Sequence, residues 1–101
     1  MIPRVALGVV LASAAFSVNA QDDAVARSLA ATCANCHGTD GRSVTKGVPA
    51  LAGQPKEFLV SQMKAFQEGR RPATVMHQIA KGYTDAQIDL LAGYLSAKEM
   101  K

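Results

Sequence analysis

Apolar residues recur along most of the chain at intervals of three and four positions, the spacing of one face of an α helix. No run of alternating β-branched residues, the pattern of a half-buried strand, interrupts this spacing. Glycine and proline punctuate the segment from residue 38 to residue 55, which is expected to form one long loop. The pattern predicts an all-α protein with about four helical segments and no sheet.

The first helix is predicted to begin near Asp22 or Asp23, because acidic side chains suit the positive end of a helix. The residues that follow at helical intervals are expected to share one face: Val25, Leu29, Cys33 and Cys36. That face leads directly into a pair of cysteines.

A second helix is predicted from about Pro55 to Glu68, since proline suits the start of a helix and Gly69 stops it. Its buried stripe is expected to consist of three residues, with Phe58 beside them: Leu59, Met63 and Phe66.

Two shorter helical segments are predicted towards the end of the chain. One spans Val75 to Lys81 and ends at Gly82. The other begins at Thr84 and Gln87, which form a capping-box pattern. The inner face of this last helix is expected to carry Ile88, Leu91 and Leu95.

The chain opens with the pattern of a secretion signal. Arg4 is followed by an uncharged apolar run from Val5 to Val18, and Ala20 ends a group that suits signal peptidase. The run is short for a membrane span. We therefore expect a signal peptide at residues 1–20, one domain at residues 21–101, a periplasmic location and no membrane span after cleavage. An uncleaved anchor is the alternative.

Composition excludes some classes of function and raises a question about the core. The net charge of +3 is mild, and Arg70-Arg71 is the only basic pair, so nucleic acid is not an expected partner. Aromatic residues make up 5% of the chain and tryptophan is absent. So small a domain usually needs an additional stabilising element, either a disulfide or a cofactor around which its helices pack.

The motif Cys33-Ala34-Asn35-Cys36-His37 favours the cofactor. Cysteines three positions apart lie on one side of a helical turn, where each thiol can add to one vinyl group of the same porphyrin. His37 follows at once, and a proximal histidine is a standard ligand of haem iron. The motif therefore predicts one covalently bound haem c, with Cys33 and Cys36 attaching it and His37 ligating the metal.

Three other interpretations of the cysteine pair were weighed. A thioredoxin-like dithiol needs a βαβ context, which the pattern does not offer. A zinc site could recruit His77, but Cys36 and His37 are adjacent, which is awkward for two ligands of one tetrahedral ion. A disulfide between Cys33 and Cys36 would leave His37 and the thin core unexplained.

Four residues after the motif could supply the sixth iron ligand: Met63, Met76, His77 and Met100. Met63 falls on the apolar stripe of the second helix, and Met100 lies at the frayed chain end. Met76 follows the break at Gly69–Pro72, where the backbone can bend over the far face of a ring. Met76 is favoured, and His77 would instead make a bis-histidine site. A thioether ligand raises the reduction potential.

Four segments make the chain resemble a class I c-type cytochrome: Cys33–His37, Val48–Gln54, the region of Met76, and Leu91–Leu95. Within that family, Val75–Tyr83 makes it most similar to the cytochrome subunit of flavocytochrome c sulfide dehydrogenase and to related dihaem cytochromes. Only one Cys-x-x-Cys-His motif is present, so the resemblance is to a single-haem form. It implies a small class I cytochrome c fold wrapped around one covalent haem.

The resemblance also implies specific residue roles. Met76 would be the distal ligand, and the carbonyl of Pro49 would accept a hydrogen bond from the free ring nitrogen of His37. The first and last helices would cross, with Gly93 permitting close approach and Tyr94 packing nearby. Apolar residues are expected to wall the ring: Leu51, Phe58, Leu59, Ile79 and Leu91. Basic residues are expected to surround its exposed edge: Lys46, Lys56, Arg70, Arg71 and Lys81.

The function expected from this site is transfer of single electrons to and from redox proteins, and not catalysis. One hypothesis is a subunit that accepts electrons from a flavoprotein that oxidises sulfide. A second is a free shuttle to a terminal oxidase or reductase. The third is a haem enzyme or gas binder with an open distal position, which Met76 disfavours.

Overall fold

The computed structural model describes residues 2–4, 8 and 16–100, with only the backbone described for residues 16–19. The described part contains five α helices, one 3₁₀ helix and no strand, which confirms the predicted all-α class. The elements in chain order are α1 (Phe16–Ala31), α2 (Ala34–His37), the 3₁₀ helix η1 (Thr39–Gly41), α3 (Lys56–Gln67), α4 (Met76–Ala80) and α5 (Asp85–Ser96). The signal predicted at residues 1–20 lies largely outside the described residues and stays a prediction.

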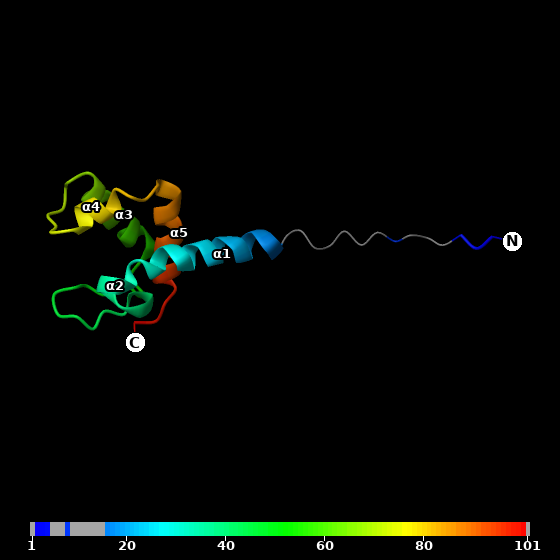
Figure 1. Ribbon diagram of the computed structural model, residues 1–101, viewed down its shortest axis with the longest axis horizontal. Coiled ribbons are helices and arrows are strands. Elements are labelled where there is room, and N and C mark those ends of the chain that lie inside the picture. Colours follow the sequence, from blue (N-terminus) through cyan, green and yellow to red (C-terminus); the bar gives the residue numbers. More distant parts are fainter. Residues whose placement is uncertain (1, 5–7, 9–15, 101) are drawn as a thin grey trace.

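Helix α5 is the centre of the packing. It lies against both α1 and α3, while α4 packs on α3 (Figure 1). Two buried clusters result. The first, here called the α1–α5 cluster, contains Ala30, Leu59, Leu91, Ala92 and Leu95. The second, here called the α4 cluster, contains Met63, Phe66, Ala80 and Ile88.

Local signals set the bounds of α3, which agree with the prediction to within one residue at each end. Pro55 precedes the first helical residue, and Gly69 follows the last turn with a φ of +71°. In that conformation the backbone NH of Arg70 donates to the carbonyl of Ala65 at 2.9 Å, which satisfies a carbonyl of the last turn. The predicted stripe of Leu59, Met63 and Phe66 is buried.

Helix α5 begins at the predicted capping box. The hydroxyl of Thr84 accepts from the backbone NH of Gln87 at 3.2 Å, and the Gln87 side chain accepts from the backbone NH of Thr84 at 3.0 Å. The predicted inner face is buried throughout: Ile88, Leu91 and Leu95.

Helix α1 differs from the prediction in two respects. It begins at Phe16 rather than near Asp22, because neither proline nor glycine interrupts the chain between Phe16 and Ala31. Its buried face carries Ala26 and Ala30, whereas Val25 is 43% exposed. The predicted face is only partly covered: Leu29 packs against the α1–α5 cluster and Val25 does not, because the alanines of α1 face α5.

The crossing of α1 and α5 itself is present, but Gly93 does not make it possible. A Cβ atom placed on Gly93 would meet nothing closer than the Lys56 side chain at 3.8 Å, an ordinary van der Waals contact. The close approach comes instead from alanines on both helices, Ala26 and Ala30 on α1 and Ala92 on α5. None of the helices in the described part of the chain has the length and hydropathy of a membrane-spanning segment.

Candidate haem-binding site

The cysteine motif lies where α1 ends and α2 begins. The backbone NH of Cys33 donates to Ala30 at 3.1 Å, and the backbone NH of His37 donates to the carbonyl of Cys33 at 2.8 Å. The motif is therefore wound as one helical turn, which brings Cys33, Cys36 and His37 together. Both thiols are free, with Cys33 half-buried and Cys36 exposed.

The surroundings of Cys33 differ from those of an ordinary surface thiol. Burial raises the pKa of Cys33 above its usual value. The hydroxyl of Thr32 donates to the carbonyl of Leu29 at 2.7 Å, so the hydroxyl of Tyr83, 2.6 Å away, donates to Thr32. Tyr83 thus connects the segment after α4 to the residue before Cys33.

His37 is buried, with 8% of its surface exposed, and its ring is oriented by one strong contact. The Nδ1 atom lies 2.7 Å from the carbonyl oxygen of Pro49, which accepts only. The proton must therefore be on Nδ1, and the lone pair of Nε2 is left for a metal. The contact that the resemblance implied between His37 and Pro49 is present in the structure.

Glycines shape the backbone that follows His37. Gly38 has a φ of +83°, and a Cβ atom there would lie 2.3 Å from the carbonyl oxygen of Arg42. Gly41 is buried with a φ of +77°, and its carbonyl accepts hydrogen bonds from the backbone NH groups of Leu51 and Ala52 at 2.8 and 3.1 Å. These positions turn the chain back so that Pro49 reaches the imidazole.

Met76 is the first residue of α4, half-buried, and it packs against the α4 cluster. In Figure 1, α4 lies above α2 at the left of the molecule, and the two helices are separate. Met76, as the first residue of α4, belongs to a different element from the turn that holds the cysteines. Met63 is buried within the α4 cluster, and Met100 is 76% exposed. The Nδ1 atom of His77 is buried and has no hydrogen-bond partner among the described residues.

The residues present fit a large apolar group with a metal at its centre. Two thiols precede an imidazole whose Nε2 is free, and three large apolar side chains of α3, α4 and the segment before α4 are uncovered. They are Phe58, Val75 and Ile79, at 47%, 53% and 44% exposure. Of the residues predicted to wall the ring, Leu59 and Leu91 are buried in the α1–α5 cluster, and Leu51 packs against it.

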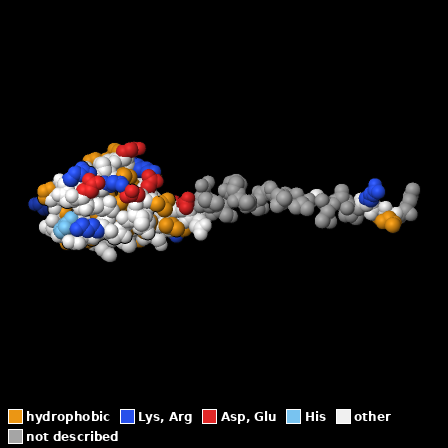
Figure 2. Space-filling model, turned by 90° about the horizontal axis from the view of Figure 1, so that it is seen from above, with side chains coloured by type: hydrophobic (Ala, Val, Ile, Leu, Met, Phe, Trp, Pro, Cys, Tyr) orange, Lys and Arg blue, Asp and Glu red, His pale blue; other side chains and the backbone are white. Residues whose placement is uncertain are grey.

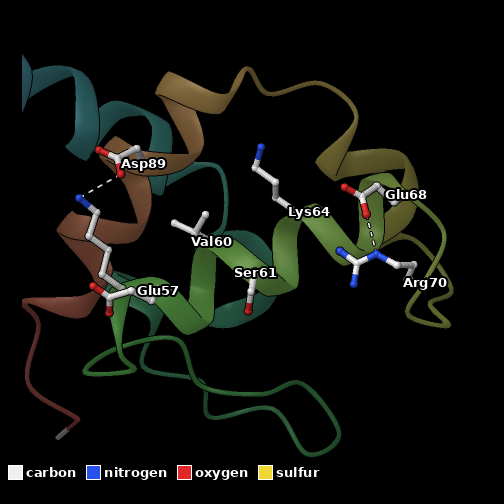
Figure 3. A pocket seen from close by; sticks show the side chains of 8 residues that line it. Glu57, Val60, Ser61, Lys64, Glu68, Arg70 and Asp89 are labelled. Atoms are coloured by element: carbon white, nitrogen blue, oxygen red, sulfur yellow. Dashed lines mark hydrogen bonds and ion pairs between the residues drawn. The ribbon is translucent and has the colours of Figure 1, made fainter.

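A charged groove on α3 and α5 lies apart from these residues. Acidic and basic side chains intermix on the face seen in Figure 2, and Figure 3 shows the groove with its ion pairs. Lys56 pairs with Asp89 at 3.0 Å, and Glu68 pairs with Arg70 at 2.5 Å. Lys56 and Arg70, predicted to surround the exposed edge of the ring, are thus paired with carboxylates of the chain itself.

Sequence reasoning missed a polar residue behind α4. The side-chain amide of Gln67 donates to the carbonyl of Ala80 at 2.8 Å and to that of Tyr83 at 3.0 Å. It therefore holds the end of the short helix that begins with Met76. No sequence signal identifies Gln67, because its partners lie 13 and 16 positions away.

Comparison with known proteins assigns the family. The family described as cytochrome c matches residues 23–98, so the chain belongs to the cytochrome c family. It is a small c-type cytochrome of class I, helical over the described residues, with one covalently bound haem c, as in proteins that are similar to it.

Individual relatives are similar over different shares of their length. The cytochrome subunit of sulfide dehydrogenase from Chlorobaculum tepidum is 42% identical over 66 residues, which are 65% of this chain and 59% of that protein. Cytochrome c-554(548) from Halomonas halodenitrificans is 37% identical over 83 residues, 79% of this chain and 100% of that protein. The cytochrome c4 structure from Acidithiobacillus ferrooxidans has a TM-score of 0.65 at 36% identity, covering 73% of this chain and 50% of that one.

Proposed function

We propose that this chain is a periplasmic electron carrier whose haem is attached through Cys33 and Cys36 and ligated by His37 and Met76. The observation that supports this most directly is the 2.7 Å contact between His37 Nδ1 and the carbonyl of Pro49. It leaves the lone pair of Nε2 available to a metal. The apolar run after Arg4 supports export of the chain.

When bound, haem c supplies a one-electron Fe(III)/Fe(II) couple. The chain's own residues then determine how the site behaves. His37, oriented by Pro49, and Met76 would hold the haem iron, and a thioether ligand favours a higher potential than a second imidazole. Phe58, Val75 and Ile79, which are exposed to solvent in this structure, would offer apolar surface to the ring.

The attachment is tested by denaturing the purified holoprotein from cells equipped for haem ligation. The haem colour should stay with the denatured polypeptide. In the double variant Cys33→Ala with Cys36→Ala, the colour should no longer stay with the polypeptide. Colour that separates from the wild-type chain on denaturation would refute covalent attachment. His37→Ala should give no stable holoprotein.

The distal ligand is tested with carbon monoxide added to the reduced protein. A site closed by Met76 should bind it slowly and incompletely. Rapid and complete binding would favour the open site of a gas binder and would refute ligation by Met76.

We further propose that the electron donor is a flavoprotein that oxidises sulfide. Two similar proteins support a donor that acts on reduced sulfur compounds. One is the cytochrome subunit of sulfide dehydrogenase, and the other is the thiosulfate dehydrogenase electron acceptor of Thiomonas intermedia, 41% identical over 68 residues. Co-purification with a flavin-containing partner from a periplasmic extract supports a fixed subunit. A lone monomer that exchanges electrons with many proteins supports a free shuttle instead.

Two lysines, Lys46 and Lys81, lie on segments that flank the site, and their charges support a partner with an acidic surface. Lys46 and Lys81 have no carboxylate within ion-pair distance among the described residues, in contrast to Lys56. Lys81→Glu should slow electron transfer from the donor at low salt, and the difference should shrink as salt rises. Lys56→Gln, which removes a cation already paired with Asp89, serves as the control.

A further inference from the structure

The carbonyl of Pro49 orients His37, yet no helix or strand positions that carbonyl. Residues 42–55, here called the Pro49 loop, connect η1 to α3 without regular structure. Pro49 is exposed and has no backbone NH with which to anchor itself. The position of the carbonyl must therefore be set by contacts of its neighbours in the loop.

The side chain of Ser43 makes the contact on the N-terminal side of Pro49. Its hydroxyl lies 2.7 Å from the carbonyl oxygen of Val48, the residue before Pro49, and 3.3 Å from the carbonyl of Thr45. A hydroxyl has one proton, and the shorter distance assigns it to Val48. The same oxygen accepts from the backbone NH of Thr45 at 3.3 Å. One half-buried side chain thus joins both arms of the loop.

On the C-terminal side of Pro49 the short contacts join backbone groups, and one longer side-chain contact runs from Gln54 Nε2 to the carbonyl of Ala50 at 3.4 Å. The carbonyl of Gly41 accepts from Leu51 and Ala52, so any side chain at those positions leaves the bonds in place. The loop is therefore held on both sides of Pro49, and Ser43 makes the shorter of the two side-chain contacts to the residues that flank Pro49.

We propose that Ser43 is a positioning residue for His37, acting through the Val48–Pro49 peptide. This rests on the proposed role of His37 as the proximal ligand. With the hydroxyl in place, the Pro49 carbonyl holds the Nδ1 proton and raises the basicity of the ring. A more basic imidazole stabilises the ferric form. Loss of the hydroxyl frees the loop, weakens the bond to Nδ1 and shifts the equilibrium towards the ferrous form.

The test compares Ser43→Ala, Ser43→Thr and Ser61→Ala in the holoprotein. Ser61 is a matched control, because its hydroxyl also donates to a backbone carbonyl, that of Phe58 at 2.8 Å, but on an exposed part of α3. Two quantities are measured: the reduction potential, and the rate at which the His37 Nδ1 proton of the reduced protein exchanges with solvent, observed by proton NMR.

Ser43→Ala should raise the reduction potential. It should also speed the exchange of the His37 Nδ1 proton by about fivefold, the factor expected for one neutral hydrogen bond. Ser43→Thr keeps a hydroxyl, so its potential and exchange rate should match those of the wild type. Ser61→Ala should also leave both quantities unchanged. Equal exchange rates in wild type and Ser43→Ala would overturn the inference. Iron ligation should shift the NMR signals of the His37 ring protons strongly in the wild type. If that large shift is absent, the proposed ligation of His37 is overturned instead.

Discussion

Gly41 and Gly47 offer a matched test of how the Pro49 loop is built. Both have positive φ, +77° and +86°, so alanine at either position is strained in the same way. Their surroundings differ. A Cβ atom on Gly41 would lie 2.9 Å from the backbone nitrogen of Ala52 and 2.9 Å from the Cβ of Leu51, whereas nothing lies within 4 Å at Gly47. The pair therefore separates backbone strain from steric overlap.

The expected magnitudes follow from these two terms. A left-handed backbone costs an alanine about 1–2 kcal/mol. The lower entropy of the unfolded chain offsets about 0.4–1 kcal/mol of that. Gly47→Ala should therefore destabilise by about 1 kcal/mol. Gly41→Ala adds overlap with backbone that cannot move aside, about 1–3 kcal/mol, which makes about 3 kcal/mol in total.

Guanidinium unfolding of the oxidised holoprotein measures both free energies, and unchanged m-values would show that the unfolded states are comparable. Gly41→Ala should also move Leu51 and Ala52, whose NH groups bond to Gly41, and so disturb the spectrum of the haem. If the two variants differ by less than roughly 0.5 kcal/mol, within the usual scatter of such comparisons, the close packing around Gly41 does not stabilise the fold.

Three further outcomes are expected. Met76→Ala should lower the reduction potential and abolish the weak far-red sulfur-to-iron band while the haem stays attached, as potentiometry and absorption spectra can check. Leu95→Ala, at a side chain 1% exposed, should cost about 2–5 kcal/mol in denaturant unfolding, whereas Val44→Ala, at 96% exposure, should change it by less than about 0.5 kcal/mol. Tyr94→Phe removes the hydroxyl that donates to Asp40 at 2.9 Å and should cost about 1 kcal/mol in the same assay.

Elements with local signals were predictable from the sequence. Pro55 and Gly69 bound α3, and the Thr84–Gln87 capping box starts α5, because these residues act on backbone within a few positions of themselves. The cysteine motif was recognisable for the same reason, since Cys33 to His37 form one turn. The buried stripes of α3 and α5 followed from spacing alone.

Features set by partners distant in sequence were not predictable. The buried face of α1 carries Ala26 and not Val25, because α5 approaches closely there. Ser43 and Gln67 are ordinary polar residues in the sequence, and their roles arise only when the chain brings carbonyl groups within reach. The contact of Pro49 with His37 came from a resemblance to a known family, since spacing does not imply it.

The two proposed iron ligands lie beside different buried clusters. Met76 packs on the α4 cluster, while the turn that ends in His37 continues from α1, whose Ala30 belongs to the other cluster. The clusters share α3 and α5 but no fully buried residue. Val60 and Tyr83 pack against both clusters, so a substitution at either should affect both sides of the iron. A substitution at Ala30 or at Met63, each within one cluster, should act mainly on the ligand beside that cluster, so evolution could tune the two sides of the iron at different positions.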